Sequence, residues 1–396
     1  MSDPTNLTYD FFSPQQIVFG WGRRSELGQH AKLLGNRAWL VCGSRTLQQS
    51  GIIDQILSIL SAADIPAKTI TTISREPEVH DVDELTKKLV ASGAGPGDFL
   101  IAVGGGSAID LAKACSAMVT NRHGNSVQDF LEGVGAGLKI TQAPLPLLAM
   151  PTTAGTGTEA TKNAVLSSYD PPFKKSLRSE LMIPKCVLID PELAATAPPA
   201  ITAQSGMDAI TQLIESFVSC RAKPIPTALC LSGLKLAVPA IETAVSDGTN
   251  RAAREAMAHA ALLSGIALAN SGLGFAHGVA PALGVHCKVP HGLACATLLP
   301  VAMQVNCEVA KEKFAQLEAL FAESNEPTTD EEAANAFIQR IQNINTNIGI
   351  PNRLSQLGVT ASQLPAIVKS SRGNSMNGNP RELTDAELHD ILEAVL

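Results

Sequence analysis

Two histidines and one acidic residue in the second half of the chain have the types and surroundings expected of metal ligands. His277 and His291 lie in the segments GFAHG and PHG, where small neighbours leave room around each imidazole. Asp208 lies upstream in GMDA, on a predicted helix that is otherwise largely apolar. One carboxylate and two imidazoles commonly hold a catalytic divalent cation with open positions. Buried histidines with ordinary hydrogen-bond partners explain the same spacing equally well.

Gln212 is a further polar residue on that helix. It follows Asp208 by four residues, so both side chains share one helical face. The two polar side chains stand out on a helix that is otherwise largely apolar.

A glycine-rich loop in the first half is a candidate phosphate-binding site. It follows the apolar run 99–103 and opens a predicted helix over 108–119. Its residues are Gly104, Gly105, Gly106 and Ser107. Glycine lets the backbone approach a ligand closely, and free N–H groups at a helix N-terminus attract anions. We expect a pyrophosphate here, with a plain tight turn as the alternative.

A second loop, PTTAGTGTE over 151–159, also follows an apolar run and combines two glycines with four threonines. A threonine-rich turn without a ligand is its simpler explanation. Two such loops on one sheet favour a dinucleotide.

The elements that position these residues fall into two groups. Before Asp190, short apolar runs alternate with helical patterns, which predicts βαβ units and a parallel sheet. The expected strands are 38–42, 67–73, 99–103, 145–150 and 186–189, and the expected helices are 52–60, 82–92 and 108–119. After Asp190 only helices are predicted, over 203–219, 226–245, 251–270, 292–306, 308–323, 331–348, 361–371 and 384–396. We therefore expect an α/β domain over 1–190 and an all-α domain over 191–396.

The composition narrows the classes of protein. The chain has 396 residues, of which 45% are hydrophobic and 17% charged, with a net charge of −7. The length suits two domains, and the acidic balance argues against nucleic acid. No segment reaches the roughly 18 apolar residues of a membrane span, and Met257–Ala269 is expected to be a buried helix. The N-terminus lacks a signal-peptide pattern. The eight cysteines form no CxxC pair, so we expect buried thiols in a cytoplasmic protein.

Five segments in order resemble the iron-containing (group III) alcohol dehydrogenase family, from about Phe11 to the C-terminus. They are GGGSAIDLAK over 104–113, PTTAGTGTE over 151–159, LIDPEL over 188–193, GMDAITQLIE over 206–215, and His277 with Pro290-His291-Gly292. The resemblance implies a dehydroquinate synthase-like fold, with an α/β dinucleotide-binding domain followed by a helical domain. It also implies a cofactor and a divalent metal, Fe²⁺ with Zn²⁺ as the alternative, in the cleft between them. Family members commonly form homodimers, so a homodimer or higher homo-oligomer is expected.

The same resemblance assigns roles to individual residues. Gly104, Gly105, Gly106 and Ser107 would hold the pyrophosphate, and Thr152, Thr153 and Thr156 would line the path of the adenosine and nicotinamide. Lys174 lies near a family lysine that contacts the nicotinamide ribose. The family's metal ligands are one Asp and three His, of which Asp208, His277 and His291 match three.

Two positions depart from the family. Gln212 stands where many members have the remaining histidine, and a neutral amide oxygen is a weaker ligand that suits harder cations. Pro281 stands where a histidine often helps to relay a proton. His286 and Cys287 are nearby candidates for that role.

The nucleotide preference is predicted from the end of the first strand. NAD-preferring members usually carry an Asp there, whereas this chain has Ser44 followed by Arg45. A lost carboxylate and a gained cation favour a 2′-phosphate, so NADP(H) is expected over NAD(H). A solvated Arg45 and an enzyme indifferent to the phosphate are the alternative.

These observations predict reversible hydride transfer between a nicotinamide and a small primary alcohol or aldehyde, with no membrane or nucleic-acid partner. Asp208, His277 and His291 are the predicted catalytic residues. A metal-independent enzyme of the maleylacetate reductase type is the main alternative, because of Gln212. A lyase of the dehydroquinate synthase type and a non-catalytic cofactor-binding protein are the others.

Overall fold

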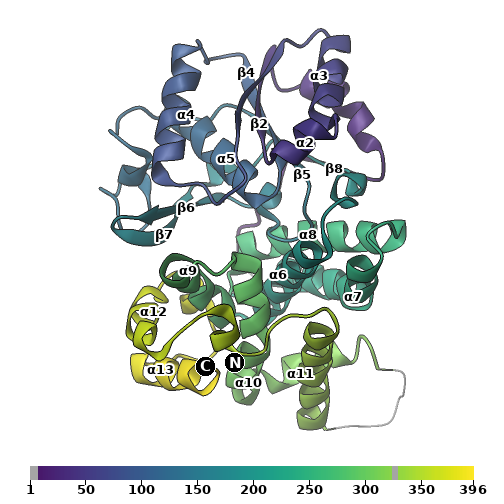
Figure 1. Cartoon of the computed structure of the whole chain (residues 1–396), viewed down its shortest axis with the longest axis vertical. Coiled ribbons are helices and arrows are strands. Elements are labelled where there is room, and N and C mark those ends of the chain that lie inside the picture. The colour runs from purple at the N-terminus through teal and green to yellow at the C-terminus, as the bar shows by residue number, and fades with distance from the viewer. Residues whose placement is uncertain (1–7, 323–328) are drawn as a thin grey trace.

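The computed structural model describes residues 8–322 and 329–396, and it has two halves (Figure 1). A sheet flanked by helices forms the upper half, and a group of helices forms the lower half. The N-terminal segment lies against the helical half, where the backbone N–H of Phe12 donates to Asn270 Oδ1 at 2.7 Å. The first half therefore contacts the helical half through its N-terminal segment, and it continues into that half at its C-terminal end.

A six-stranded parallel sheet forms the centre of the first half, in the order β1-β8-β5-β4-β2-β3. Its strands are β1 Gln16–Phe19, β2 Arg37–Cys42, β3 Ala67–Thr72, β4 Asp98–Gly104, β5 Leu147–Pro151 and β8 Cys186–Ile189. β2 and β4 are neighbours in the sheet. β3 lies beside β2 on the outer side of this pair, and β5 lies beside β4 on its other side. The strand order thus reverses between β2 and β4, and ligands bind beyond the carboxyl ends of the strands at such a point.

Helices cover both faces of this sheet. They are α1 Leu27–Ala31, α2 Arg45–Gln49, α3 Ile52–Ala62, α4 Val79–Ala91 and α5 Gly106–Thr120. Alternate residues of β2 serve the two faces: Trp39 and Val41 pack with α4 and α5, and Leu40 packs with α1 and α3. Both faces are buried, which explains why the strands read as continuous apolar runs.

An antiparallel hairpin, β6 Asn163–Tyr169 and β7 Pro172–Arg178, extends beside the sheet. It was not predicted, and neither was β1. Polar residues interrupt the apolar alternation of the hairpin, since Ser167 pairs with Lys174 across it. The five predicted strands are all present.

The second half contains helices only, apart from loops, in the described residues. They are α6 Pro199–Val218, α7 Pro224–Ser246, α8 Arg251–Ser271, α9 Phe275–Cys287, α10 His291–Glu318, α11 Asp330–Asn347, α12 Leu364–Ser370 and α13 Asp385–Ala394. α6 packs against α7, α8 and α10. Short 3₁₀ helices join elements throughout: Arg23–Glu26, Val127–Phe130, Thr158–Ala160, Glu180–Met182, Pro191–Ala194, Leu354–Leu357, Ala361–Gln363 and Met376–Gly378.

One predicted boundary in this half needs correction, and one helix was missed. The helices expected over 292–306 and 308–323 form α10, whose backbone leaves the helical region at Ala310 (φ −124°) rather than at Cys307. Glu323, the end of the second, lies outside the described residues. α9 was missed, because Gly278, Pro281 and Gly284 interrupt its pattern.

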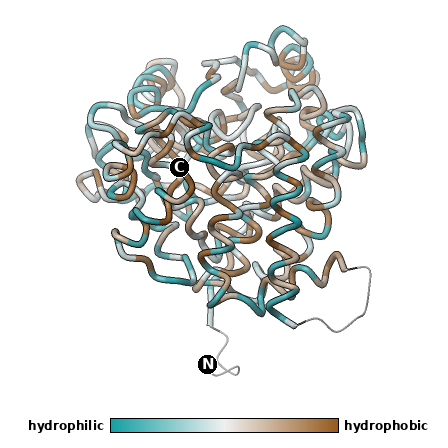
Figure 2. Tube along the Cα trace, turned by 60° about the horizontal axis from the view of Figure 1, so that its bottom comes forward, coloured by the Kyte–Doolittle hydropathy of each residue, from teal (hydrophilic) through white to brown (hydrophobic). Residues whose placement is uncertain are grey.

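The expectation about membrane spans was wrong for two helices. α7 and α10 are long and apolar enough to cross a membrane by length and composition alone. Figure 2 shows hydrophobic stretches along the packed helices of this half. α7 packs on α6 and α8, and α10 packs on α6, α9 and α11. Met257–Ala269 lies within α8 and is mostly buried, as expected.

Candidate active site

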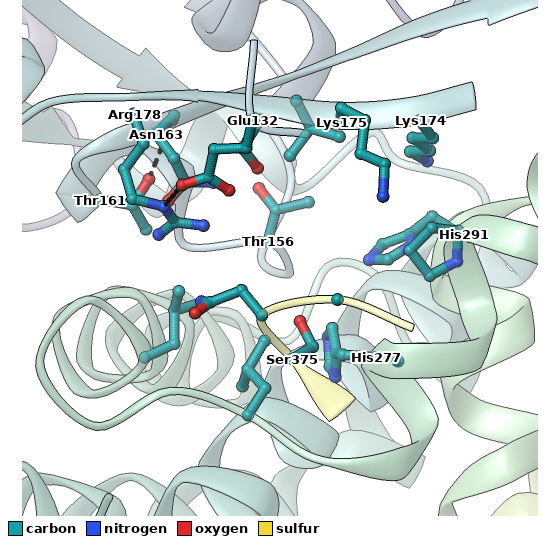
Figure 3. Close-up of a pocket in the computed structure, with 18 of the residues that line it drawn as sticks. Glu132, Thr156, Thr161, Asn163, Lys174, Lys175, Arg178, His277, His291 and Ser375 are labelled. Carbon is teal, nitrogen blue, oxygen red and sulfur yellow. Dashed lines mark hydrogen bonds and ion pairs between the residues drawn. The ribbon is translucent and has the colours of Figure 1, made fainter. Parts of the chain in front are cut away.

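A cavity of about 570 Å³ lies where the two halves meet, and residues from both halves line it (Figure 3). Gly106 and Ser107 enter from the glycine-rich loop, and Lys174 enters from β7. His277 and His291 enter from α9 and α10. The predicted phosphate loop and the predicted metal site therefore open into one space.

Close backbone contact holds the glycine-rich loop at the end of β4. A Cβ at Gly43 would lie 2.5 Å from the Cα of Gly104, and a Cβ on Gly104 would lie 2.6 Å from the Cα of Gly43. The two strand ends therefore touch through glycines at the point where the strand order reverses. α5 begins at Gly106 without a side-chain cap, which leaves its first N–H groups for an anion.

The threonine-rich loop packs against that loop and against the helical half. A Cβ at Gly106 would lie 2.9 Å from Thr156 Oγ1, and Thr156 lines the cavity. Gly157 has a φ of +58°, and a Cβ on it would lie 2.5 Å from the Cα of Gly265 in α8. The glycine in this position thus allows α8 to approach the sheet closely.

The other predicted cofactor residues lie around this centre. Thr152 and Thr153 follow β5, and a Cβ on Gly105 would meet Thr153 Oγ1 at 3.1 Å. Ser44 Oγ accepts from Leu47 N and caps α2, while Arg45 is exposed. Lys174 Nζ lies 2.6 Å from Glu76 Oε1 at the cavity wall. Their roles toward a cofactor remain predictions.

α6 presents three buried polar residues at helical spacing: Asp208, Gln212 and Glu215. Asp208 Oδ1 lies 3.1 Å from His277 Nε2 and 3.9 Å from His291 Nε2. The structure therefore brings together three of the four residues that were predicted as metal ligands. Gln212 also lines the cavity, with its Oε1 2.7 Å from Ser264 Oγ.

Glu215 fixes the position of His277, and the sequence analysis missed this role. Its Oε1 accepts from the backbone N–H of Ala276 at 2.6 Å, in the first turn of α9. Its Oε2 lies 2.7 Å from His277 Nδ1. A carboxylate on Nδ1 turns Nε2 toward Asp208, the arrangement that orients a metal-binding imidazole. The signal was its position seven residues after Asp208, on the same helical face.

His291 owes its place to the close approach of α10 to α6. It is the first residue of α10, after Pro290. A Cβ at Gly292 would lie 2.6 Å from the carbonyl oxygen of Gln204 and 3.5 Å from Asp208 Cβ. A larger residue than glycine at 292 would push His291 away from Asp208.

Cys295 is a fourth potential ligand that the sequence analysis grouped with the ordinary buried thiols. It lies one turn after His291 in α10, and its Sγ is 3.7 Å from His291 Nε2. Donor atoms of Asp208, His277, His291 and Cys295 all lie within 4.8 Å of one another. The spacing His-x₃-Cys was the available signal.

The electrostatics of this group differ between its two imidazoles. Burial acts to lower the pKa of His277, but Cys295, Asp208 and Glu215 together raise it well above its ordinary value. Burial and the nearby Lys174 lower the pKa of His291 to about 4. Burial would raise the pKa of Asp208, but His277 and His291 hold it below its usual range. At neutral pH His291 is therefore uncharged, with a lone pair available.

The donor set fits a divalent metal. Two imidazoles, one carboxylate and one thiol converge, and the second nitrogen of His277 is held by a carboxylate. His291 Nδ1 is buried and has no hydrogen-bond partner among the described residues.

The proposed substitutes for a proton-relaying histidine do not line the cavity, although His286 contacts Ser370, which does. Pro281 lines it from within α9. His286 Nε2 lies 2.8 Å from Ser370 Oγ, near the end of α9, and Cys287 ends that helix. Neither His286 nor Cys287 is among the cavity-lining residues in the described part of the chain.

Two family profiles match nearly the whole chain. Residues 14–191 match the family described as iron-containing alcohol dehydrogenase. Residues 202–396 match the one described as Fe-containing alcohol dehydrogenase family, C-terminal.

Individual proteins resemble the chain over almost all of its length. It is 32% identical over 391 residues to 1,3-propanediol dehydrogenase of Citrobacter freundii, covering 97% of each chain. It is 32% identical over 377 residues to lactaldehyde reductase of Escherichia coli K12, covering 95% of each. The solved structure of an alcohol dehydrogenase from Oenococcus oeni superposes with a TM-score of 0.91 at 30% identity, covering 98% of this chain and 100% of that one.

Proposed function

The chain belongs to the iron-containing alcohol dehydrogenase family, and on that premise we propose that its cavity carries out reversible hydride transfer between NADP(H) and a small primary alcohol or aldehyde. It is an oxidoreductase acting on CH–OH groups, with a nicotinamide cofactor and a metal. One observation carries the proposal: the N-terminus of α5 and the group around Asp208 line the same cavity.

The phosphate loop and β7 position the cofactor. The N–H groups of Gly106 and Ser107 at the uncapped start of α5 would bind the pyrophosphate, and Lys174 at the cavity wall would contact the nicotinamide ribose. Both points line the same cavity as His277 and His291, so a nucleotide held there would lie beside the helical half. Holding both reactants in one orientation lowers the barrier by restricting their motion in advance.

The helical half supplies the site for the substrate oxygen. Asp208, His277 and His291 would hold the metal, which supplies Lewis-acid stabilisation of an alkoxide when bound. Glu215 keeps His277 Nε2 directed at this point. Gln212 remains the predicted fourth ligand on α6. Leu268, Leu273 and Met376 give the cavity apolar walls, which suits a small, weakly polar substrate.

Pro281 limits how the proton of the alcohol can be transferred. Its side chain carries no titratable group, and it faces the cavity where a histidine often stands in the family. Pro281 therefore takes no part in proton transfer, and the hydroxyl proton of the alcohol would leave through solvent in the cavity.

The preference for NADP(H) rests on the exposed Arg45 beside Ser44 at the end of β2. No carboxylate stands at either position to repel a 2′-phosphate. Exposed charges contribute little, so Arg45→Asp should change the ratio of NADPH to NADH efficiency roughly two- to tenfold in favour of NADH.

Three organisational proposals accompany the reaction. The chain divides at residue 190 into a nucleotide-binding domain over 1–190 and a metal- and substrate-binding domain over 191–396. We place the protein in the cytoplasm, because most of its cysteines are buried and free. A homodimer or higher homo-oligomer is expected from the family.

The test is turnover of an aldehyde panel with NADPH and with NADH, using enzyme stripped of metal and then reloaded with Fe²⁺ or Zn²⁺. The proposal predicts turnover that appears only after reloading. Equal turnover in the stripped enzyme would contradict it and favour a metal-independent reductase.

A further inference from the structure

We propose that Cys295 is the fourth protein ligand of the metal, in place of the α6 side chain at position 212, and that the resulting Asp, His, His, Cys set selects Zn²⁺ over Fe²⁺. The inference rests on the metal site of the proposed function. It changes the identity of one ligand and the ion that the site prefers.

The separations of the donor atoms carry the proposal. Bonds of about 2.0–2.3 Å at tetrahedral angles place donor atoms about 3.3–3.6 Å apart. Asp208 Oδ1 lies 3.1 Å from His277 Nε2 and 3.9 Å from His291 Nε2. Cys295 Sγ lies 3.7 Å from His291 Nε2. These three distances bracket the edges of such a tetrahedron, and all four donor atoms lie within 4.8 Å of one another, so small side-chain shifts would bring them around one ion.

The helix that carries Cys295 keeps its sulfur in this place. α10 presents His291 and Cys295 on one face, one turn apart. Cys295 is fully buried, and Gly292 between them lets α10 lie against α6 at Asp208.

The side-chain oxygen of Gln212 already accepts a hydrogen bond from another helix. Its Oε1 lies 2.7 Å from Ser264 Oγ, which joins α6 to α8. A neutral amide is also a weaker ligand for a transition metal than a thiolate. At this site α6 therefore contributes the amide of Gln212, and α10 contributes the thiol of Cys295.

The thiol decides which metal is preferred. Binding breaks the S–H bond, releases the proton to solvent and forms a metal–sulfur bond. Soft thiolate ligands in tetrahedral sites favour Zn²⁺, whereas carboxylate and amide oxygens favour harder ions. Four protein ligands leave the substrate oxygen to enter as a fifth, an expansion that zinc tolerates.

Cobalt substitution tests the ligand directly, because a thiolate bound to Co²⁺ gives a charge-transfer absorption in the near ultraviolet. Full-length stripped protein is titrated with Co²⁺ and its spectrum recorded, together with Cys295→Ser and Gln212→Ala. Both substituted residues are buried, so the variants are matched in position. We expect the band in the wild type and in Gln212→Ala, and its loss in Cys295→Ser.

Competition between ions tests the consequence. Under anaerobic conditions with equal Zn²⁺ and Fe²⁺, the wild type should retain zinc, and Cys295→Ser should lower the zinc-to-iron ratio about tenfold or more. Cobalt bound by the wild type without the band would overturn the proposal even if Cys295→Ser fails to fold. Absence of any cobalt binding by the folded wild type would instead overturn the metal site of the proposed function.

Discussion

Two buried polar clusters border the cavity, one in each half, and they balance their charge differently. The Lys113 cluster consists of Asp110, Lys113, Thr158, Glu159 and Thr161, on α5 and the loop after β5. The Asp208 cluster consists of Asp208, Glu215, His277, His291 and Cys295. The first includes a lysine, Lys113, whose pKa burial lowers to about 8, whereas the second has two carboxylates and no lysine or arginine among its members.

In the Lys113 cluster, Lys113 and Asp110 find their hydrogen-bond partners within the cluster and on the neighbouring strand β6. Lys113 Nζ donates to Thr161 Oγ1 at 2.7 Å, to the carbonyl of Asn163 at 2.8 Å and to Thr158 Oγ1 at 3.1 Å. Asp110 accepts from Thr158 Oγ1 and from Val165 N. Its hydrogen bonds tie α5 to the start of β6. The Asp208 cluster instead gathers the donor atoms of Asp208, His277, His291 and Cys295 within 4.8 Å of one another, as a metal site does. The predictions below test this difference.

Asp208→Asn should produce the largest effect. The substitution removes the carboxylate that lies next to both imidazoles and is the charged metal ligand. Turnover of the enzyme with added metal should therefore fall roughly 1,000-fold or more, which corresponds to several kcal/mol of lost transition-state stabilisation. Steady-state assay with an active aldehyde measures this, and circular dichroism checks the fold. Turnover within tenfold of the wild type would remove Asp208 from the site.

Lys113→Met should act on stability instead. It leaves Asp110 buried without its cation, which costs about 3–5 kcal/mol in the free energy of unfolding. Denaturant titration measures the loss. The double variant Lys113→Met/Asp110→Asn should recover part of it, since the stranded charge is gone. A single variant as stable as the wild type would show that the cluster is not a charge-balanced unit.

Glu159 should make stability depend on pH. Burial raises its pKa from 4.5 to about 7, so the folded state holds more protons than the unfolded state between these values. Stability from this group is therefore fully present below pH 4.5 and is lost as the pH rises through 7. The loss is at most about 3 kcal/mol. Unfolding of Glu159→Gln measured from pH 5 to 8 should show a flatter profile, and a parallel profile would contradict the assignment.

Glu215→Gln should have the smallest of these effects. The amide oxygen can still accept from Ala276, but it no longer holds His277 Nδ1 by a carboxylate. Metal affinity should fall about 10- to 100-fold while the protein stays folded. Competition with a chelator measures the affinity. An unchanged affinity would mean that Glu215 serves only as the cap of α9.

The sheet half was predictable because its signals are local. Apolar runs ending in glycine gave β2 and β4 with their boundaries nearly correct, and family segments located both loops. The β6–β7 hairpin was missed because its pairing partners, such as Ser167 and Lys174, are polar. Its position depends on α5 and on the cavity rather than on its own pattern.

The Asp208 cluster was only partly predictable because its members meet through tertiary packing. Asp208, His277 and His291 were proposed from residue type and resemblance. Glu215 and Cys295 were not, since their roles depend on the register of α6 against α9 and of α10 against α6. Gly292 shows the reason: it is a small residue whose importance appears only where two helices touch.

Metal stoichiometry tests the central claim most directly, that the Asp208 cluster takes its cation from outside the chain. Calorimetric titration of stripped protein with Zn²⁺ should give one strongly bound ion per chain in the wild type. Asp208→Asn should give no strong binding, whereas Asp110→Asn, in the Lys113 cluster, should bind as the wild type does. A folded wild type that binds no zinc, or an Asp208→Asn variant that binds it equally well, would contradict the account.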